Sequence, residues 1–173
     1  MSPFLKLRVT VLLLLLALTV GCDQTSKHFA RAELSQLGAV SLPGGFGELR
    51  LADNPGSFLS LGASLPGPTR LLLLTIGVAV ALVALFAYLA RNTAPDWLSF
   101  LGLALVWSGG TSNLIDRVTR HGLVTDFVFL QVGPLHTGVF NLADFVIVIG
   151  VTLLVCSLIK RPSKPASAGN TTR

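Results

Sequence analysis

Two aspartates in the C-terminal half of the chain have the residue type and the spacing to act together. Asp144 ends the segment 140–144 (FNLAD), inside the apolar run 139–159. A carboxylate at the centre of a bilayer costs about 2.5 to 3.5 kcal/mol, so such a residue usually has a partner or a function. Asp126 lies 18 residues earlier, in the segment 122–127 (GLVTDF). Two carboxylates at one membrane-edge site predict acid and base catalysis of a hydrolysis.

The composition indicates the kind of protein in which these aspartates must be positioned. Of 173 residues, 51% are apolar and only 12% are charged, against about 25% charged in a usual soluble domain. Runs of about 20 apolar residues match the thickness of a bilayer. We therefore predict an all-α membrane protein with four transmembrane helices, and these spans are 9–27, 71–90, 97–115 and 139–159.

The first apolar run has a second interpretation. Residues 9–22 are short for a span, and Gly21-Cys22 resembles the end of a lipoprotein signal. Three further spans make a secreted, lipidated protein a poor interpretation, so we count this run as span one. The whole of 1–159 then forms one membrane domain, and the tail 160–173, rich in Pro, Ser and Ala between its charges, is expected to be disordered.

The loops between the spans predict a small β-element outside the cytoplasm. The outer loop 31–68 is too long for a bare connection, and polar and apolar residues alternate with strand period at 48–52. The side with both termini has seven basic residues and one acidic residue, and the other side has six basic and seven acidic residues. This modest difference favours cytoplasmic termini. Carboxylate chemistry would then take place at the outer face.

The remaining reactive side chains offer little chemistry of their own. His28, His121 and His136 show no metal-ligand spacing, so we expect neither a metal nor a cofactor. Cys22 and Cys156 fall near opposite ends of their spans, too far apart for a disulfide, and are expected to pack as small apolar side chains. A basic tail beside anionic lipid explains the pI near 9.9 without nucleic acid.

Five segments together resemble the lipoprotein signal peptidase family (signal peptidase II). They are 23–27 (DQTSK), 54–58 (NPGSF), 113–117 (NLIDR), 124–127 (VTDF) and 140–144 (FNLAD). Their order and spacing agree with the family across nearly the whole of 9–159. Two features depart from it: one residue is missing between Gly56 and Phe58, and Ser112 stands where the family usually has Gly.

The resemblance implies a membrane aspartyl endopeptidase of the bacterial inner membrane, with Asp126 and Asp144 as the catalytic pair. Its substrates would be diacylglyceryl-modified prolipoproteins, cut before the lipidated Cys at the outer leaflet, and its other partners would be membrane lipids. We expect a monomer. Family residues that lie near the substrate match Asn54, Asn113, Arg117 and Asn141.

The residues also allow structural roles. Asp144 could pair with Arg117, and Asn141 could cap span four with Asp144 in the third helical position. Asp23 and Lys27 stand four apart, which predicts a structural ion pair, and Asp116 at a helix end is expected to fix a loop.

Two other functions remain open at this stage. A small proton-coupled transporter would use Asp144 in a relay and would not need Asp126. A membrane scaffold without enzymatic activity would need neither carboxylate.

Overall fold

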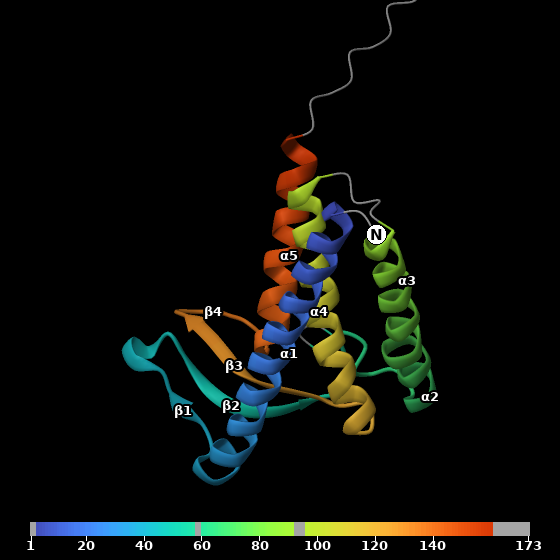
Figure 1. Ribbon diagram of the computed structural model, residues 1–173. Helices are drawn as coiled ribbons and strands as arrows, with labels where there is room; N and C mark the ends of the chain where they lie inside the picture. The colour runs from blue at the N-terminus through green and yellow to red at the C-terminus, as the bar shows by residue number, and fades with distance from the viewer. Residues whose placement is uncertain (1–2, 58–59, 92–95, 161–173) are drawn as a thin grey trace, which may run out of the picture.

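A computed structural model describes residues 3–57, 60–91 and 96–160 (Figure 1). Within these residues, four helices are long and apolar enough to cross a membrane, as the sequence predicts. They are α1 (Pro3–Leu37); the continuous helix formed by α2 (Gly67–Arg70), the π-helical η3 (Leu71–Gly77) and α3 (Val78–Ala90); α4 (Trp97–Thr119); and α5 (Leu142–Lys160). The tail that the sequence predicts to be disordered lies, after Lys160, outside the described residues.

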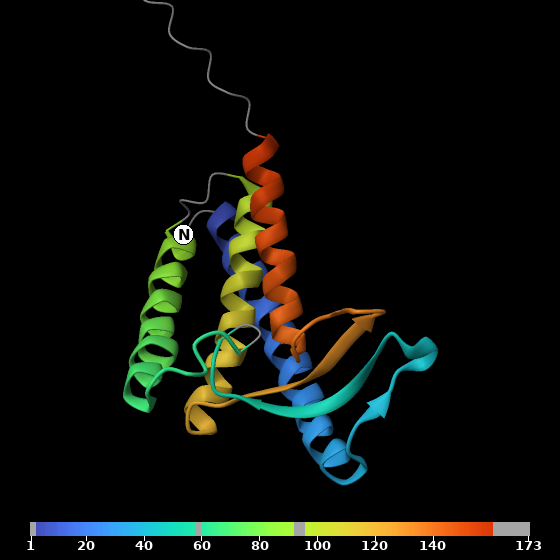
Figure 2. The same ribbon diagram turned by 180° about the vertical axis from the view of Figure 1, so that it is seen from behind.

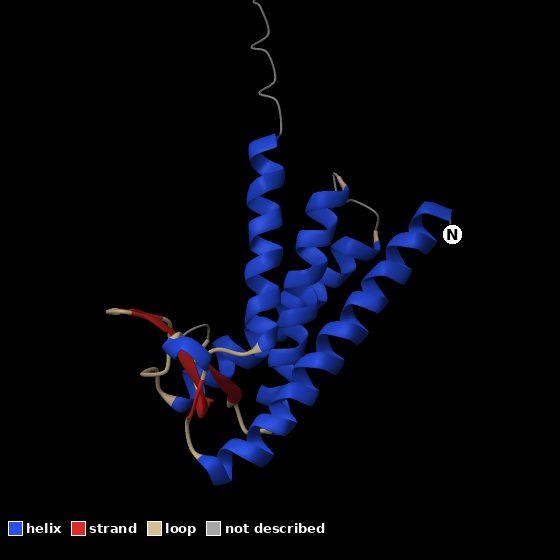
Figure 3. Ribbon diagram, turned by 90° about the vertical axis from the view of Figure 1, so that its left-hand side faces the viewer, coloured by secondary structure: helices blue, strands red, loops and turns tan. Residues whose placement is uncertain are grey.

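The first helix is much longer than the span predicted for it. Helix α1 continues ten residues past Lys27 to Leu37 and extends beyond the other helices (Figure 3). Ala30 and Leu34 are buried on this extension, one helical turn apart. Helix α1 contacts strand β2 (Gly47–Asn54), and Arg31 on this extension donates to the Thr125 hydroxyl. Contacts with residues of the β-element therefore hold the extension of the helix.

The predicted β-element is present, but half of it comes from an unexpected part of the chain. The strands β1 (Val40–Ser41), β2, β3 (Val124–Val132) and β4 (Leu135–His136) form an antiparallel sheet in the order β1-β2-β3-β4. The sheet lies at the end of the bundle opposite the N-terminus (Figures 1 and 2). The outer loop 31–68 supplies only β1 and β2, because the longest strand follows α4.

Helix α4 is the centre of the bundle and packs against α1, α3 and α5. Its contact with α5 is close enough that backbone meets backbone. An added Cβ at Gly150 would lie 2.7 Å from the carbonyl oxygen of Gly102, and one at Gly109 would lie 2.7 Å from that of Ala143. Glycines thus bring α5, and the Asp144 in its first turn, directly against α4.

A polar and aromatic cluster holds the other end of the bundle together. The guanidinium group of Arg8, buried on α1, lies over the rings of Phe4, Trp97 and Phe100 at 4.5 to 5.3 Å. Asp96 caps α4 by accepting a hydrogen bond from the Ser99 backbone nitrogen. These contacts fix the start of α1 on the start of α4. Cys22 and Cys156, in contrast to the expectation that they pack inside, are exposed because each lies on an outward helix face.

Substitution Gly150→Ala should destabilise the bundle. The new Cβ meets a backbone oxygen, which cannot rotate away, and overpacking of this kind costs about 1 to 3 kcal/mol. Gly21→Ala on α1 is the matched control, because nothing lies within 4 Å of its added Cβ. That control should be neutral or stabilising by up to about 1 kcal/mol through helix propensity. Thermal unfolding of both purified variants in detergent tests this, and equal unfolding temperatures would contradict the packing argument.

Candidate active site

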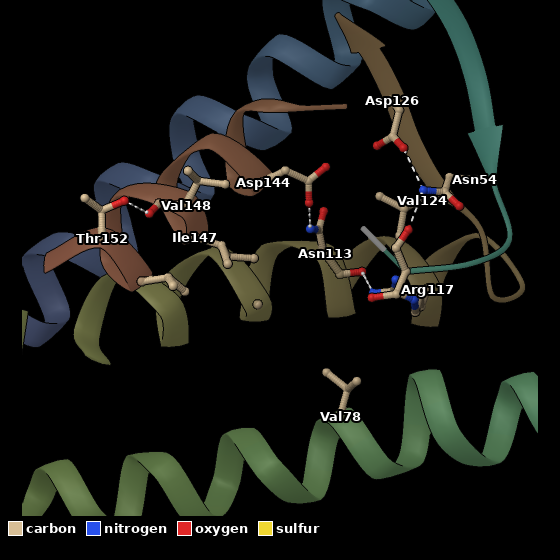
Figure 4. A pocket seen from close by; sticks show the side chains of 13 residues that line it. Asn54, Val78, Asn113, Arg117, Val124, Asp126, Asp144, Ile147, Val148 and Thr152 are labelled. Carbon is tan, nitrogen blue, oxygen red and sulfur yellow. Dashed lines mark hydrogen bonds between the residues drawn. The ribbon is translucent and has the colours of Figure 1, made fainter. Parts of the chain in front are cut away.

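The two aspartates named by the sequence come from different elements and line one pocket. Asp126 lies on β3, and Asp144 lies in the first turn of α5 (Figure 4). Asn54, at the end of β2, reaches Asp126 from the neighbouring strand, where Ala52 pairs with Asp126 after a bulge. The side chains of the pair are 1% and 6% exposed. Two carboxylates are therefore held with little access to bulk water.

The start of α5 is closed by a reciprocal capping box, as one interpretation of the sequence predicts. The side-chain oxygen of Asn141 accepts a hydrogen bond from the Asp144 backbone nitrogen at 3.0 Å. In return, Asp144 Oδ2 accepts one from the Asn141 backbone nitrogen at 3.2 Å. The Asn141 amide nitrogen also donates to Asp126 Oδ1 at 2.7 Å. One residue thus caps the helix and contacts the other aspartate.

Each of the four carboxylate oxygens of the pair accepts a hydrogen bond. Asn54 Nδ2 donates to Asp126 Oδ2 at 2.8 Å, and Asn113 Nδ2 donates to Asp144 Oδ1 at 2.9 Å. Asn141 supplies the other two donors, through its side chain and its backbone. All four donors are neutral amide groups, which stabilise the ionised form of a carboxylate without adding charge.

Burial, and after it the negative charge of Asp144, raises the pKa of the Asp126 carboxyl from its usual 3.8 to about 6. The hydrogen bonds from Asn54 and Asn141 and the positive charge of Lys27 oppose this rise. Asp126 therefore keeps a proton into a pH range where an exposed aspartate has lost it. Two nearby carboxyls that retain one proton can offer one acid and one base at the same site.

An ion cluster lies behind the pair. Lys27 Nζ lies 2.7 Å from Asp23 Oδ2 and 3.2 Å from Asp116 Oδ2, and the Lys27 side chain is fully buried. Its third contact is with Asn113 Oδ1 at 3.0 Å. Asp23 Oδ1 accepts from the Ala143 backbone nitrogen on α5, and Asp116 Oδ2 accepts from the Thr125 backbone nitrogen on β3. The Asp23–Lys27 ion pair expected from their spacing is present.

The cluster also includes Ser112 and Gln24, to which the sequence assigns no role. Ser112, which departs from the family pattern, donates to Asp23 Oδ2 at 2.7 Å. Gln24 donates to Asp116 Oδ1 at 2.9 Å and also reaches Ser112. A Ser directly before Asn113 carries no signal of its own, but Ser112 stands four residues before Asp116, which places both on one face of α4. The hydroxyl of Ser112 thus adds a hydrogen bond where a Gly could not.

Arg117 does not pair with Asp144. Its Nη2 atom donates to the Gly56 carbonyl oxygen at 2.9 Å, and its Nη1 atom makes a longer contact with the Asn113 carbonyl oxygen. Among the ion pairs of the described residues, none joins Arg117 to Asp144. Arg117 instead holds the turn that follows Asn54. The Asn54 side chain holds the same turn, because it accepts from the Gly56 backbone nitrogen and donates to the Ser57 carbonyl oxygen. Phe58, at the shortened end of this motif, lies outside the described residues.

A pocket of about 420 Å³ opens beside the pair. Its polar end contains Asp126, Asp144, Asn54, Asn113 and Arg117, and its walls are mostly apolar (Figure 4). The remaining lining residues are Ser57, Val78, Gly110, Val124, Ile147, Val148, Val151 and Thr152. These extend from the pair along α5, with Val78 of α3 on the facing side. No group of three or more metal-ligand side chains occurs in the described part of the chain.

Comparison with known proteins identifies the family to which this architecture belongs. The model of the signal peptidase (SPase) II family matches residues 15–160. The chain belongs to the signal peptidase II family. It is 38% identical over 148 residues to the lipoprotein signal peptidase of Moorella thermoacetica, covering 85% of this chain and 91% of that protein. The corresponding protein of Rhodopseudomonas palustris is 42% identical over 141 residues, covering 78% and 82%.

Solved structures share the fold. Two structures of bacterial membrane enzymes obtained by the in meso method, at 2.3 and 1.9 Å resolution, match with TM-scores of 0.73 and 0.75. The alignments cover 91% and 89% of this chain and 95% and 96% of those chains, at 22% identity in both cases. Membership of the signal peptidase II family indicates an aspartic-type peptidase. Together with the four apolar helices, it makes this chain a multi-pass bacterial membrane protein.

The Asp126→Asn variant should gain stability relative to the wild type as pH rises from 4 to 7. Because the folded pKa of about 6 exceeds the usual 3.8, the folded wild type holds a proton that the unfolded chain has released. Wild-type stability therefore falls with rising pH in this window, by at most about 3 kcal/mol, and the variant lacks this loss.

Unfolding temperatures of both proteins across this pH range test the prediction. The difference in unfolding temperature between the variant and the wild type should increase with pH, whatever its value at any one pH. Asp53→Asn is the control, because Asp53 lies next to Asn54 on β2 but is about half exposed. A constant difference between Asp126→Asn and wild type would mean that Asp126 titrates as an ordinary carboxyl.

Proposed function

We propose that this chain is a membrane aspartyl endopeptidase that removes signal peptides from diacylglyceryl-modified prolipoproteins by cleavage before the lipidated Cys. The observation that carries the proposal is the Asp126–Asp144 pair, held by four amide donors at the head of an apolar pocket. Membership of the signal peptidase II family gives the reaction class. The relatives described above are named for the same activity on lipoproteins.

In this proposal Asp126 and Asp144 are the catalytic residues and share one proton. The ionised carboxyl takes a proton from a water molecule, whose oxygen attacks the scissile carbonyl carbon. The protonated carboxyl hydrogen-bonds the carbonyl oxygen and then supplies the proton that the leaving nitrogen needs. The net exchange consumes one water and leaves the pair with one proton again. The pKa of about 6 at Asp126 supports a shared proton, since a fully ionised pair has none to donate.

The other site residues divide into substrate contacts and supports. Asn54, Asn113 and Asn141 already use amide protons on the pair, and we assign them and Arg117 to the binding of the substrate backbone beside the scissile bond. Arg117 suits this role because its Nε atom is buried without a hydrogen-bond partner and its charge lies close to both catalytic carboxyls. The apolar wall of α5 from Ile147 to Thr152 would receive the signal helix and the acyl chains. Asp23, Lys27 and Asp116 are supports.

We further propose that both termini are cytoplasmic and that the pair acts at the outer leaflet. The start of α1 and the last turn of α5 lie at one end of the bundle, and the sheet and the first turn of α5 lie at the other (Figure 1). Asp126 belongs to that sheet and Asp144 to that first turn. The basic residues near both termini support the cytoplasmic location of the end with the start of α1. A lipidated precursor presents its cleavage site at the outer leaflet, where Asp126 and Asp144 would meet it. We propose a monomer in contact with membrane lipids, without nucleic acid or cofactor.

Substitutions Asp126→Asn and Asp144→Asn should each abolish cleavage of a lipidated prolipoprotein. Each change removes a proton-transfer group at nearly constant volume, and such groups contribute about 10² to 10⁴ in rate. A gel-shift assay with purified protein and lipidated substrate measures this. Asp53→Asn, on the same strand as Asn54 but outside the pocket, should retain the wild-type rate. Turnover by either site variant within about threefold of wild type would reject the pair as catalytic.

The assay also separates the two other functions. A transporter that uses Asp144 alone would tolerate Asp126→Asn and depend on a proton gradient. A scaffold without activity would tolerate both substitutions, and the wild type would leave the substrate intact.

Cysteine labelling tests the proposed topology. In a background without the exposed Cys22 and Cys156, a cysteine at Ser64 should react with an impermeant thiol reagent added to intact cells. A cysteine at Arg91, also exposed but at the opposite end of α3, should react only after the membrane is opened. The reverse pattern would place the pair at the cytoplasmic face.

A further inference from the structure

The side-chain amides around the catalytic pair have only one orientation that satisfies their neighbours. An asparagine oxygen and nitrogen have nearly the same shape, so the surrounding donors and acceptors decide which way each amide points. Asn54 Oδ1 accepts from the Gly56 backbone nitrogen at 2.8 Å, and Asn141 Oδ1 accepts from the Asp144 backbone nitrogen at 3.0 Å. Backbone N–H groups can only donate, so both amides must turn their nitrogen toward Asp126.

Asn113 is oriented differently, because a charged side chain contacts its oxygen. Lys27 Nζ lies 3.0 Å from Asn113 Oδ1, and an ammonium group has no acceptor atom. Asn141 Nδ2 reaches the same oxygen at 3.1 Å, so both lone pairs are used. The Asn113 nitrogen is thereby left to donate to Asp144 Oδ1 at 2.9 Å. The Lys27 charge also polarises the amide in the direction that strengthens this donation.

Lys27 is itself held in place by three acceptors for its three protons. Asp23 Oδ2, Asp116 Oδ2 and Asn113 Oδ1 lie 2.7, 3.2 and 3.0 Å from Nζ. With full burial of the side chain, the ammonium group has no alternative partner in solvent. These contacts with α1 and α4 therefore fix the position of Nζ, and the fixed Nζ in turn holds the Asn113 side chain in one orientation.

We propose that Lys27 is a positioning residue for the catalytic pair, which acts through Asn113 by fixing and polarising the amide that holds Asp144. This inference rests on the proposed function and goes beyond the structural ion pair that the sequence predicts. Its consequence is that the ion cluster affects turnover as well as folding. The role requires the Lys27–Asn113 contact.

A double-substitution cycle between Lys27 and Asn113 tests the inference. Lys27→Met should lower kcat by about ten- to a hundredfold with KM within about threefold, because a misplaced catalytic group affects the transition state more than binding. In an Asn113→Ala background the same substitution should cost at most about twofold more, since the residue through which it acts is gone. Losses that multiply independently would overturn the inference.

The pH profile of kcat/KM gives a reading that a purely structural role would not move. Asp126 faces Asp144 of α5, Arg117 of α4 and Lys27 of α1, with the neutral Asn54 on β2. Removal of the Lys27 cation should shift the limb set by Asp126 to higher pH, because the cation favours the ionised carboxyl. Asp96→Ala, which removes the cap of α4 at the other end of the bundle and leaves the ion cluster intact, is the control for lost stability. It should lower the unfolding temperature and leave kcat and the profile in place, and a limb that moves equally in both variants would contradict the inference.

A second pair of variants tests the inference if Lys27→Met does not fold. If Lys27→Met is not recovered as a folded protein, the cycle is repeated with Lys27→Met and Asp23→Asn together, which keeps the net charge of the cluster, against Asp23→Asn alone. Failure of the proposed function is distinguishable, because the wild type would then not cleave lipidated prolipoprotein at all. Failure of this inference leaves wild-type cleavage intact and removes only the dependence on Lys27 through Asn113.

Discussion

The buried ammonium group of Lys27 connects α1, α4, α5 and β3, and thereby the two elements that carry Asp126 and Asp144. It joins α1 to α4 directly, and through Asp23 and Asp116 it reaches the backbone of α5 at Ala143 and of β3 at Thr125. Taking three charges out of water costs several kcal/mol per ion, which their attraction only roughly offsets. Net stability is therefore a weak explanation for the cluster. Any arrangement that separates its members, however, leaves a buried charge unpaired, at about 3 to 5 kcal/mol.

The position of Asp144 explains how a carboxylate is tolerated in an apolar run. Helix α5 begins at Leu142, so Asp144 lies in its first turn and accepts from the Asn141 backbone. A negative charge there is favoured by the helix dipole and by the capping box. The glycine contacts between α4 and α5 then bring this turn against Asn113. The carboxylate is placed at a helix end beside the sheet, where hydrogen bonds from amides replace hydration.

The sequence predicts much of this arrangement, and its failures have physical causes. Apolar run lengths and the segments around Asp126 and Asp144 predict the four helices and the pair, because burial in lipid and shared chemistry leave strong local patterns. Strand β3 was not predicted, since its pairing with β2 joins residues about 75 positions apart and depends on no local pattern. The alternative pairing of Arg117 with Asp144 is not among the ion pairs of the described residues; Arg117 instead contacts the Gly56 backbone carbonyl, a kind of partner that side-chain patterns in a sequence do not indicate. The extension of α1 to Leu37 was not predicted either, because the apolar run of the first span does not indicate that the helix continues into contact with the sheet.

The same contacts explain why one wall of the pocket is less firmly held than the others. Helix α3 takes no part in the ion cluster, and its segment is the least buried of the four apolar helices. The contacts that attach it to α4 include those of Trp107, which donates to the Leu82 carbonyl and stacks on Phe86. Val78 faces the pocket one turn and more before these contacts, directly after the π-helical segment Leu71–Gly77. The wall that carries Val78 is thus held through the contacts of Trp107, whereas Asp126 and Asp144 are held through the ion cluster and the sheet. Separating apolar side chains leaves no buried charge unpaired, so a displacement of α3 costs less than one of the elements that carry the two aspartates.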